Sequence, residues 1–319
     1  MRASTTGLLL LLIATLGLAG CTDRHTLTVA VHPWIGYESL CLAQDLGWLP
    51  RQVTLQHGRT AAESLAALQA GTVDAAGLTL DEALKARGAG VPLSAVLVLD
   101  SSAGGDMLMA RPGITRLTDL KGQRIGYEPT AVGALVLSEA LTQAGLGQDD
   151  IVHVELPITE QVAAWQAGEV DAVVTYEPTA SLLRARGARR LFDSRRMPDT
   201  IFDVLAVRRD RLAGRQSALR ELVKTHFRAL DYLRRNRKDA VDRIAAHQNM
   251  TAVDVRRALD GVILPHLAGN RYALSEGSRF EQAARRLERL MVQRRLLAAP
   301  DDLNQLFDAA YLPPQAPGT

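Results

Sequence analysis

The stretch LQAGTVDA, residues 68–75, returns 97 residues later as WQAGEVDA, residues 165–172. In both copies a helical pattern of apolar residues ends at a glycine, which is a common helix stop signal. In both copies an apolar run follows, at 73–78 and at 170–175, as expected for a buried strand of a parallel sheet. The repeat therefore predicts two α/β halves of similar construction.

A second match supports this division. The same offset brings TVAV, residues 28–31, onto IGYE, residues 125–128, and each is a predicted strand that leads into a turn containing proline. Strands and helices alternate through residue 207, which predicts parallel sheets with helices on both faces. Apolar positions at helical spacing between residues 216 and 308 predict a helical C-terminal extension.

The run DSSAGG, residues 100–105, interrupts this alternation with residues typical of a hinge. We expect two βαβ lobes joined by two crossings, near 100–106 and 202–206. The predicted boundaries are 27–102 with 206–319 for lobe I and 103–205 for lobe II. Ligands of such sheets bind beyond the carboxyl ends of the strands, so the two lobes should face each other across a cleft.

The N-terminus has the pattern of an exported protein. Arg2 precedes an apolar run from Gly7 to Leu18, which is too short to span a bilayer and is typical of a secretory signal. The run ends in LAGC, residues 18–21, which resembles the bacterial lipobox. This resemblance implies a signal peptide at 1–20, lipidation of Cys21 and a tether at 21–26, and an ordinary cleaved signal is the alternative.

Composition excludes several classes of function. Lys and Arg total 37 against 35 Asp and Glu, so no global charge favours nucleic acid, and the basic runs at 184–190 and 234–238 lack interleaved aromatic residues. If Cys21 carries lipid, Cys41 is the only remaining thiol, and its apolar helical context indicates a small core residue. The seven histidines show no metal-ligand spacing. We expect neither metal nor cofactor.

Five segments resemble one family, the periplasmic binding proteins of the nitrate/sulfonate/taurine type, which also includes binders of thiamine-pyrimidine precursors. They are WIGY at 34–37, LAQDLG at 42–47, AGTVDA at 70–75, LTDLKGQRIG at 117–126 and YEP at 176–178. The resemblance implies a type II periplasmic binding protein that captures a small molecule and delivers it to the permease and ATPase subunits of an ABC importer. It implies a periplasmic location, and we expect a lipid-anchored monomer that is not an enzyme.

The turns after the strands are expected to line the cleft. In lobe I, Trp34 and Tyr37 form an apolar wall or pack between lobe and loop. Thr79 and Asp81 contact the ligand or only cap a helix. The hydroxyls of Ser101 and Ser102 bind ligand or serve the hinge alone.

In lobe II, Thr130 and Ala131 open a predicted helix whose free N–H groups can bind an acceptor. Tyr176 and Glu177 hold the equivalent position after the repeated strand. The resemblance implies that Glu177 faces the cleft, and the alternative is that it offsets the helix dipole. Asp203, at the second crossing, is a further candidate.

The predicted strand ends carry carboxylates with few basic residues among them. They are Glu38, Asp81, Glu128, Glu177 and Asp203. A buried anion requires Arg, Lys or helix N-termini, whereas carboxylates favour an amine, an amidine or an amino-heterocycle. The hypothesis is therefore a ligand with a cationic or N–H-donating group, rather than nitrate.

Two other functions remain open at this stage. One is a lipoprotein that senses a ligand for a membrane signalling partner, and sequence does not separate it from a transport protein. The other is an enzyme similar to the pyrimidine-precursor synthases of the same fold. The chain contains no HExxH, GxSxG, P-loop or paired-cysteine motif, which disfavours catalysis.

Overall fold

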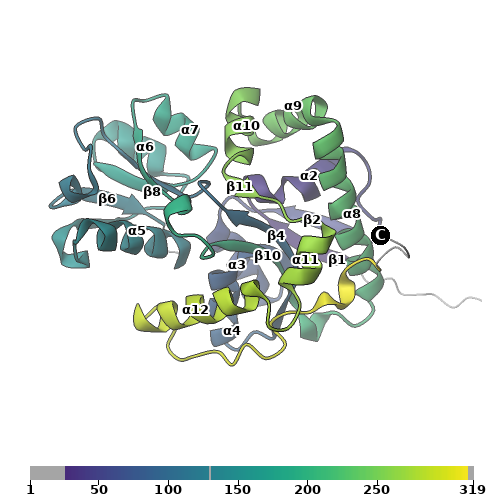
Figure 1. Cartoon of the computed structure of the whole chain (residues 1–319). Coiled ribbons are helices and arrows are strands. Elements are labelled where there is room, and N and C mark those ends of the chain that lie inside the picture. The colour runs from purple at the N-terminus through teal and green to yellow at the C-terminus, as the bar shows by residue number, and fades with distance from the viewer. Residues whose placement is uncertain (1–25, 129–130, 315–319) are drawn as a thin grey trace, which may run out of the picture.

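A computed structural model describes residues 26–128 and 131–314, which form two sheets flanked by helices (Figure 1). The first sheet has the strand order β11-β4-β10-β3-β1-β2 and the second has the order β7-β6-β8-β5-β9. The strands are β1 (Leu27–Val31), β2 (Val53–His57), β3 (Ala75–Thr79), β4 (Leu93–Ser102), β5 (Met107–Ala110), β6 (Arg124–Tyr127), β7 (Val152–Glu155), β8 (Ala172–Thr175), β9 (Arg189–Asp193), β10 (Phe202–Arg208) and β11 (Val262–Ile263). The predicted α/β class with two sheets and C-terminal helices is confirmed.

The helices follow the predicted alternation. In the first two thirds of the chain they are α2 (Glu38–Asp45), α3 (Ala61–Ala70), α4 (Leu80–Gly88), α5 (Ala131–Ala144), α6 (Gln161–Ala167) and α7 (Thr179–Arg184). The C-terminal third contains α8 (Gln216–Arg235), α9 (Arg237–Gln248), α10 (Ala252–Leu259), α11 (Leu267–Ala273) and α12 (Arg279–Gln293). Within the described residues, none of these helices is long and apolar enough to cross a membrane.

The expectation of parallel sheets is correct only in part. Strand β1 is parallel to β2 and β3, and β6 is parallel to β7 and β8. Strand β10 runs antiparallel to β3 and β4, and β5 runs antiparallel to β8 and β9. The reason is that β5 and β10 each follow a crossing. A chain that arrives from the other sheet enters at the edge where the parallel strands end.

The repeat has one structural role in both halves. Gly71 and Gly168 end α3 and α6 in the left-handed conformation, with φ of 70° and 73°. Three residues later, Asp74 accepts a hydrogen bond from the N–H of Thr28 at 2.9 Å, and Asp171 accepts one from Arg124 N–H at 3.0 Å. Each aspartate thus anchors the turn to the start of the neighbouring strand.

The two sequence matches have the same offset, but the strands that they predict do not pair in equivalent positions in the two sheets. Val29 pairs with Ala75 in the first sheet, and Ile125 pairs with Ala172 in the second. The first strand of the second half is therefore displaced by one residue from the match at 28–31 and 125–128. A single extra residue in the connecting segments accounts for the difference, since a strand's register is set by its partner.

Removing the Asp74 carboxylate is expected to lower the free energy of unfolding by about 2–3 kcal/mol, because Asp74→Ala removes the acceptor of the partly buried Thr28 N–H together with two ion pairs. Asp74 is buried, and it also forms ion pairs with Arg211 at 3.0 Å and Arg215 at 3.3 Å. Urea unfolding measures the loss. In the control Asp210→Ala, which removes an exposed partner of Arg208, the loss should stay below about 1 kcal/mol. Equal losses in the two variants would contradict this role of Asp74.

Two segments connect the sheets. The chain leaves the first sheet after Ser102 and returns between Asp193 and Phe202, which is earlier than the predicted 202–206 because Phe202 already pairs with Ser101. The hydroxyls of Ser102 and Ser194 lie 2.8 Å apart, and Ser194 also accepts from the N–H of Gly104 at 2.7 Å. The two connections are therefore held side by side. The predicted signal peptide and Cys21 lie outside the described residues.

Candidate functional site

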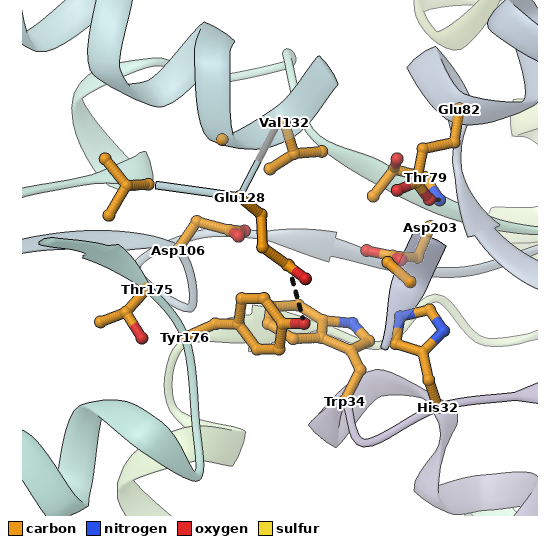
Figure 2. A pocket seen from close by; sticks show the side chains of 13 residues that line it. His32, Trp34, Thr79, Glu82, Asp106, Glu128, Val132, Thr175, Tyr176 and Asp203 are labelled. Carbon is orange, nitrogen blue, oxygen red and sulfur yellow. Dashed lines mark hydrogen bonds between the residues drawn. The ribbon is translucent and has the colours of Figure 1, made fainter. Parts of the chain in front are cut away.

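A cavity lies where the strands of both sheets end (Figure 2). It has a volume of about 510 Å³, part of which is open to solvent. Its lining residues are His32, Trp34, Ala61, Thr79, Glu82, Asp106, Glu128, Val132, Gly133, Val174, Thr175, Tyr176 and Asp203. The narrow interior fits a small molecule.

The topology explains why residues so far apart in sequence meet here. Trp34 follows β1, Glu128 follows β6 and Tyr176 follows β8, so all three lie beyond the carboxyl ends of parallel strands. Asp203 lies at the start of β10, but β10 is antiparallel and Asp203 pairs with Thr79 at the end of β3. Both strand directions therefore deliver side chains to the same edge of the first sheet.

Two aromatic side chains, one from each half, contact each other in the wall of the cavity. The rings of Trp34 and Tyr176 lie edge to face, with centroids 5.6 Å apart and an interplanar angle of 83° (Figure 2). The indole N–H of Trp34 donates to Asp100 Oδ2 at 2.9 Å. Gly36 makes this contact possible, because a Cβ at that position would lie 1.7 Å from the same oxygen.

Carboxyl groups dominate the electrostatics of the cavity and its walls. Burial raises the pKa of Asp106 and of Asp100 to about 7. Burial, reinforced by the charge of Asp81, raises the pKa of Glu82 to about 8. Burial also raises the pKa of Asp203 well above its usual value, and the negative charge of Asp100 adds to this effect. These groups cannot all be ionised together at neutral pH without a compensating charge.

The described residues supply little positive charge to balance these carboxyl groups. The thirteen lining residues contain no Lys or Arg, and burial lowers the pKa of His32 to about 4, which keeps its imidazole neutral. Glu82 Oε1, Asp106 Oδ2 and Thr175 Oγ1 are buried without a hydrogen-bond partner among the described residues. The cavity therefore offers several acceptors to a ligand that brings its own donors.

Four of the predicted site residues line this cavity: Trp34, Thr79, Tyr176 and Asp203. Two others lie immediately behind the wall. The Tyr37 hydroxyl donates to Asp203, and the Tyr37 ring packs against Gly77. Asp81 is buried beside Glu82, and burial raises its pKa to about 6. These two residues therefore position or polarise groups that line the cavity.

The remaining predicted residues lie elsewhere or outside the description. Ser101 donates to the carbonyl of Ile201 at 3.3 Å, and Ser102 bonds Ser194, so the structure places both hydroxyls in the hinge. Glu177 accepts from the N–H of Ser181 at 2.8 Å and lines a different hollow. Ala131 begins α5, and Thr130 lies outside the described residues.

Sequence reasoning missed several lining residues. Glu82 lies three residues after Thr79, the spacing of a capping box, and its carboxylate accepts from the N–H of Thr79 at 3.1 Å. Asp106 directly follows the two glycines of the hinge run, and this position beside the first crossing marks it as a possible cavity residue. Glu128 was noted as a strand-end carboxylate, and the structure adds a hydrogen bond from the Tyr176 hydroxyl at 3.4 Å.

Curated relatives match part of the chain. An Escherichia coli protein named for binding aliphatic sulfonates is 29% identical over 181 residues, which is 56% of each protein. The taurine-binding periplasmic protein of Escherichia coli is 29% identical over 125 residues, or 38% of each. A Brucella abortus protein named only as a binding protein is 24% identical over 151 residues, or 46% of this chain and 47% of that protein. The chain thus spans about half the length of the curated relatives it matches.

Solved structures share the fold over almost the whole chain. The periplasmic aliphatic sulphonate binding protein SsuA from Escherichia coli has a TM-score of 0.73 at 20% identity, covering 89% of this chain and 97% of that one. SsuA from Xanthomonas axonopodis pv. citri, bound to MOPS, has a TM-score of 0.72 at 22% identity, covering 90% and 97%. The desulfurization enzyme DszB is also similar, with a TM-score of 0.60 at 18% identity, covering 91% and 98%.

The family assignment rests on a longer match in sequence than any of these curated relatives provides. The model of the NMT1-like family matches residues 22–248, which include both sheets except β11 and all of the residues that line the cavity. The resemblance in the sequence is thereby confirmed. This chain belongs to the NMT1-like family.

Proposed function

We propose that this protein is the substrate-binding component of an ABC importer, and that its ligand is a small compound with a cationic or N–H-rich nitrogen group. The composition of the cavity wall is the observation that supports this class of ligand. Buried carboxyl groups line it, and no Lys or Arg does so among the described residues. The transport role is supported by family membership and by relatives that are named as binding proteins.

The energetics of burial favour a cation. A carboxylate transferred from water into a protein interior loses hydration that only a donor or a positive charge can replace. An amine, an amidine or an amino-heterocycle supplies both, and it would pair with the free oxygens of Glu82 and Asp106. A sulfonate or nitrate would bring a second negative charge to these groups.

The aromatic residues suit the same class of ligand. Trp34 and Tyr176 contact each other edge to face and form one aromatic wall of the cavity, and a positive or polarised nitrogen is attracted to an aromatic face. The Tyr176 hydroxyl and Glu128 add a polar edge to this wall. A flat, small, nitrogen-containing ring therefore satisfies the shape and the charge of the site together.

The lipobox-like sequence and the family membership support a cellular setting for this role. The protein is exported, lipidated at Cys21 and held in the periplasm as a monomer, where it meets the permease of the importer. Its role is capture rather than catalysis. The curated relatives are named as binding proteins, although DszB is an enzyme of similar fold. Native mass spectrometry of the purified protein distinguishes the two roles, because a binding protein returns its ligand chemically unchanged.

Neutralising one lining carboxyl is expected to weaken binding by about 10- to 100-fold, the range lost with one hydrogen bond to a charged group. Calorimetry would compare wild type with Glu82→Gln and Asp106→Asn, using aminopyrimidines, small amines, taurine, alkanesulfonates and nitrate. Asp242→Asn, an exposed change outside the cavity, serves as the control and should bind like wild type. Tight binding of nitrate or sulfonates, with no response to the amines, would reject the proposed ligand class.

A further inference from the structure

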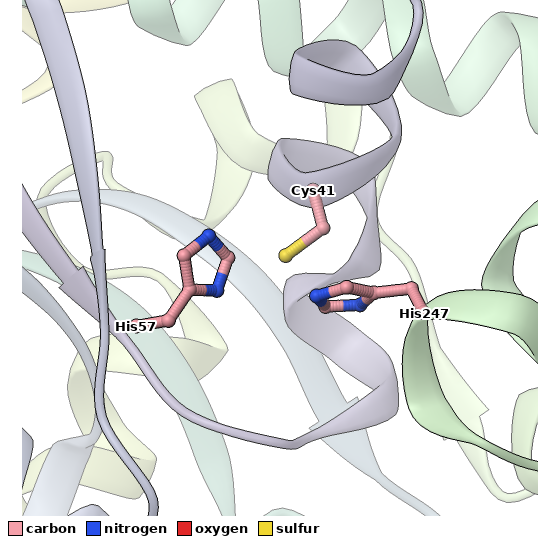
Figure 3. Close-up of side chains that lie close together, drawn as sticks. All are labelled: Cys41, His57 and His247. Atoms are coloured by element: carbon pink, nitrogen blue, oxygen red, sulfur yellow. The ribbon is translucent and has the colours of Figure 1, made fainter.

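Three potential metal ligands lie together outside the ligand cavity (Figure 3). Cys41 comes from α2, His57 ends β2 and His247 comes from α9. One ligand atom of each lies within 4.8 Å of the other two. No residue that lines the ligand cavity belongs to this cluster.

Neighbouring side chains orient both imidazole rings. His247 Nδ1 lies 2.9 Å from the carboxylate of Glu38, which accepts a hydrogen bond from Nδ1–H. Nε2 is therefore the nitrogen left for a metal ion. His57 Nε2 lies 3.0 Å from Gln44 Oε1, which leaves Nδ1 free. The two rings flank the thiol of Cys41 in Figure 3. A carboxylate or amide oxygen that fixes the second nitrogen is the usual support of a metal-bound histidine.

The surroundings suit a cation that arrives from solvent. A solvent-open hollow of about 1240 Å³ lies at the contact between α2 and α9, and Cys41 and His247 both line it. Cys41 is buried at its wall, whereas His57 and His247 are exposed. The remaining lining includes four carboxylates: Glu38, Asp45, Asp239 and Asp242. Only part of this charge is balanced within the hollow, where Arg243 pairs with Asp45 and Asp239.

The separations are close to those of a real coordination sphere. With Zn–S near 2.3 Å and Zn–N near 2.0–2.1 Å, the ligand atoms of a tetrahedral site lie about 3.3–3.8 Å apart. The observed limit of 4.8 Å therefore requires movements of roughly an ångström, which rotation of two exposed histidine side chains can supply.

We propose that Cys41, His57 and His247 bind one transition-metal ion of the Zn²⁺ class, at a site separate from the ligand cavity. Cys41 releases its proton to solvent and coordinates as the thiolate, and water takes the fourth position. A thiolate with two imidazoles selects zinc-like ions over Ca²⁺ and Mg²⁺, which require oxygen ligands. The ion joins α2, β2 and α9, and therefore clamps the edge of the first sheet to the C-terminal helices.

Titration of the purified, metal-stripped protein with Zn²⁺ by calorimetry tests the site. Wild type should bind one ion, and Cys41→Ser should weaken this binding by more than about 100-fold. Glu38→Gln keeps the three ligands and removes only the partner of His247, so an intermediate loss of about 10- to 100-fold is expected. His57→Ala changes an exposed side chain, which provides a ligand variant that should fold normally.

Two controls separate this site from other sources of binding. His153→Ala removes an exposed histidine outside the cluster, and Glu82→Gln alters the acidic ligand cavity, so both should bind Zn²⁺ like wild type. Co²⁺ gives a direct signature, since a thiolate-to-cobalt charge-transfer band should appear in wild type and be absent from Cys41→Ser. Absence of Zn²⁺ binding, binding that survives Cys41→Ser, or binding abolished by Glu82→Gln would overturn the proposal.

Discussion

Raising the pH from 6.5 to 8.5 is expected to lower the free energy of unfolding of the ligand-free protein by several kcal/mol. Burial raises the pKa of Asp100 and Asp106 to about 7 and that of Glu82 to about 8, whereas an unfolded chain has already released these protons. The folded state thus binds more protons than the unfolded state. For each extra proton that the folded state binds, the free energy of unfolding falls by about 1.4 kcal/mol per unit rise in pH.

The pH window lies above the range in which the most buried histidines act. His247 also lowers stability within it, because its hydrogen bond to Glu38 raises its pKa, so a carboxyl variant is needed to identify the carboxyl contribution. Burial lowers the pKa of His32 to about 4 and that of His226 to about 3, so these two residues make stability rise with pH, but only below the ordinary histidine value of 6.5. Urea unfolding at pH 6.5, 7.5 and 8.5 measures the slope. In Asp106→Asn the slope should decrease by the contribution of one proton, while Asp242→Asn should leave it unchanged. Stability that stays level or rises over this range would show that these carboxyls are ionised in the fold.

The second large effect is expected at Gly36, where Gly36→Ala should cost about 3 kcal/mol or more and weaken ligand binding. The added methyl would lie 1.7 Å from Asp100 Oδ2 and 2.7 Å from Trp34 Nε1. Asp100 is fully buried and cannot retreat into solvent, so the substitution combines overpacking with loss of the Trp34 hydrogen bond. Thermal unfolding and calorimetry with the ligand measure the two consequences.

Gly113→Ala provides the matched control. A Cβ at Gly113 meets no atom within 4 Å, so stability should change by less than about 0.5 kcal/mol. A double variant, Gly36→Ala with Asp100→Ala, removes the two carboxyl atoms that lie closest to the methyl, and the combined loss should be smaller than the sum of the single losses. Additive losses would mean that Gly36 acts through some other contact.

Local signals in the sequence predicted much of the fold. Helices α3 and α6 end where the repeat predicted, and the glycines that end them adopt the left-handed conformation expected of helix stops. The helix after Thr79 begins as the capping pattern indicated. Strand direction was harder to predict, because the direction of β5 and β10 depends on which sheet the chain has just left.

The candidate site was predictable only in part. Strand-end position identified Trp34, Thr79 and Tyr176, because parallel strands place the following residues at one edge. Asp203 was a candidate from its place at the second crossing, and it lines the cavity because β10 is antiparallel to β3. The same rule suggested Glu177 as a cavity residue, yet the carboxylate caps the backbone at Ser181, which was the competing interpretation. Whether a carboxylate faces a ligand or a helix N-terminus depends on side-chain direction, which spacing does not encode.

The sequence alone determined the two similar halves, the α/β alternation and the excess of carboxylates at strand ends, since these depend on contacts within a few residues or on composition. Only the tertiary structure decided which carboxyls share one buried cavity, and that Cys41 meets two histidines that lie 16 and 206 residues away along the chain. The physical reason is that burial and ligand geometry arise from long-range packing. Residues from separate strands and helices converge there at distances that no local pattern specifies.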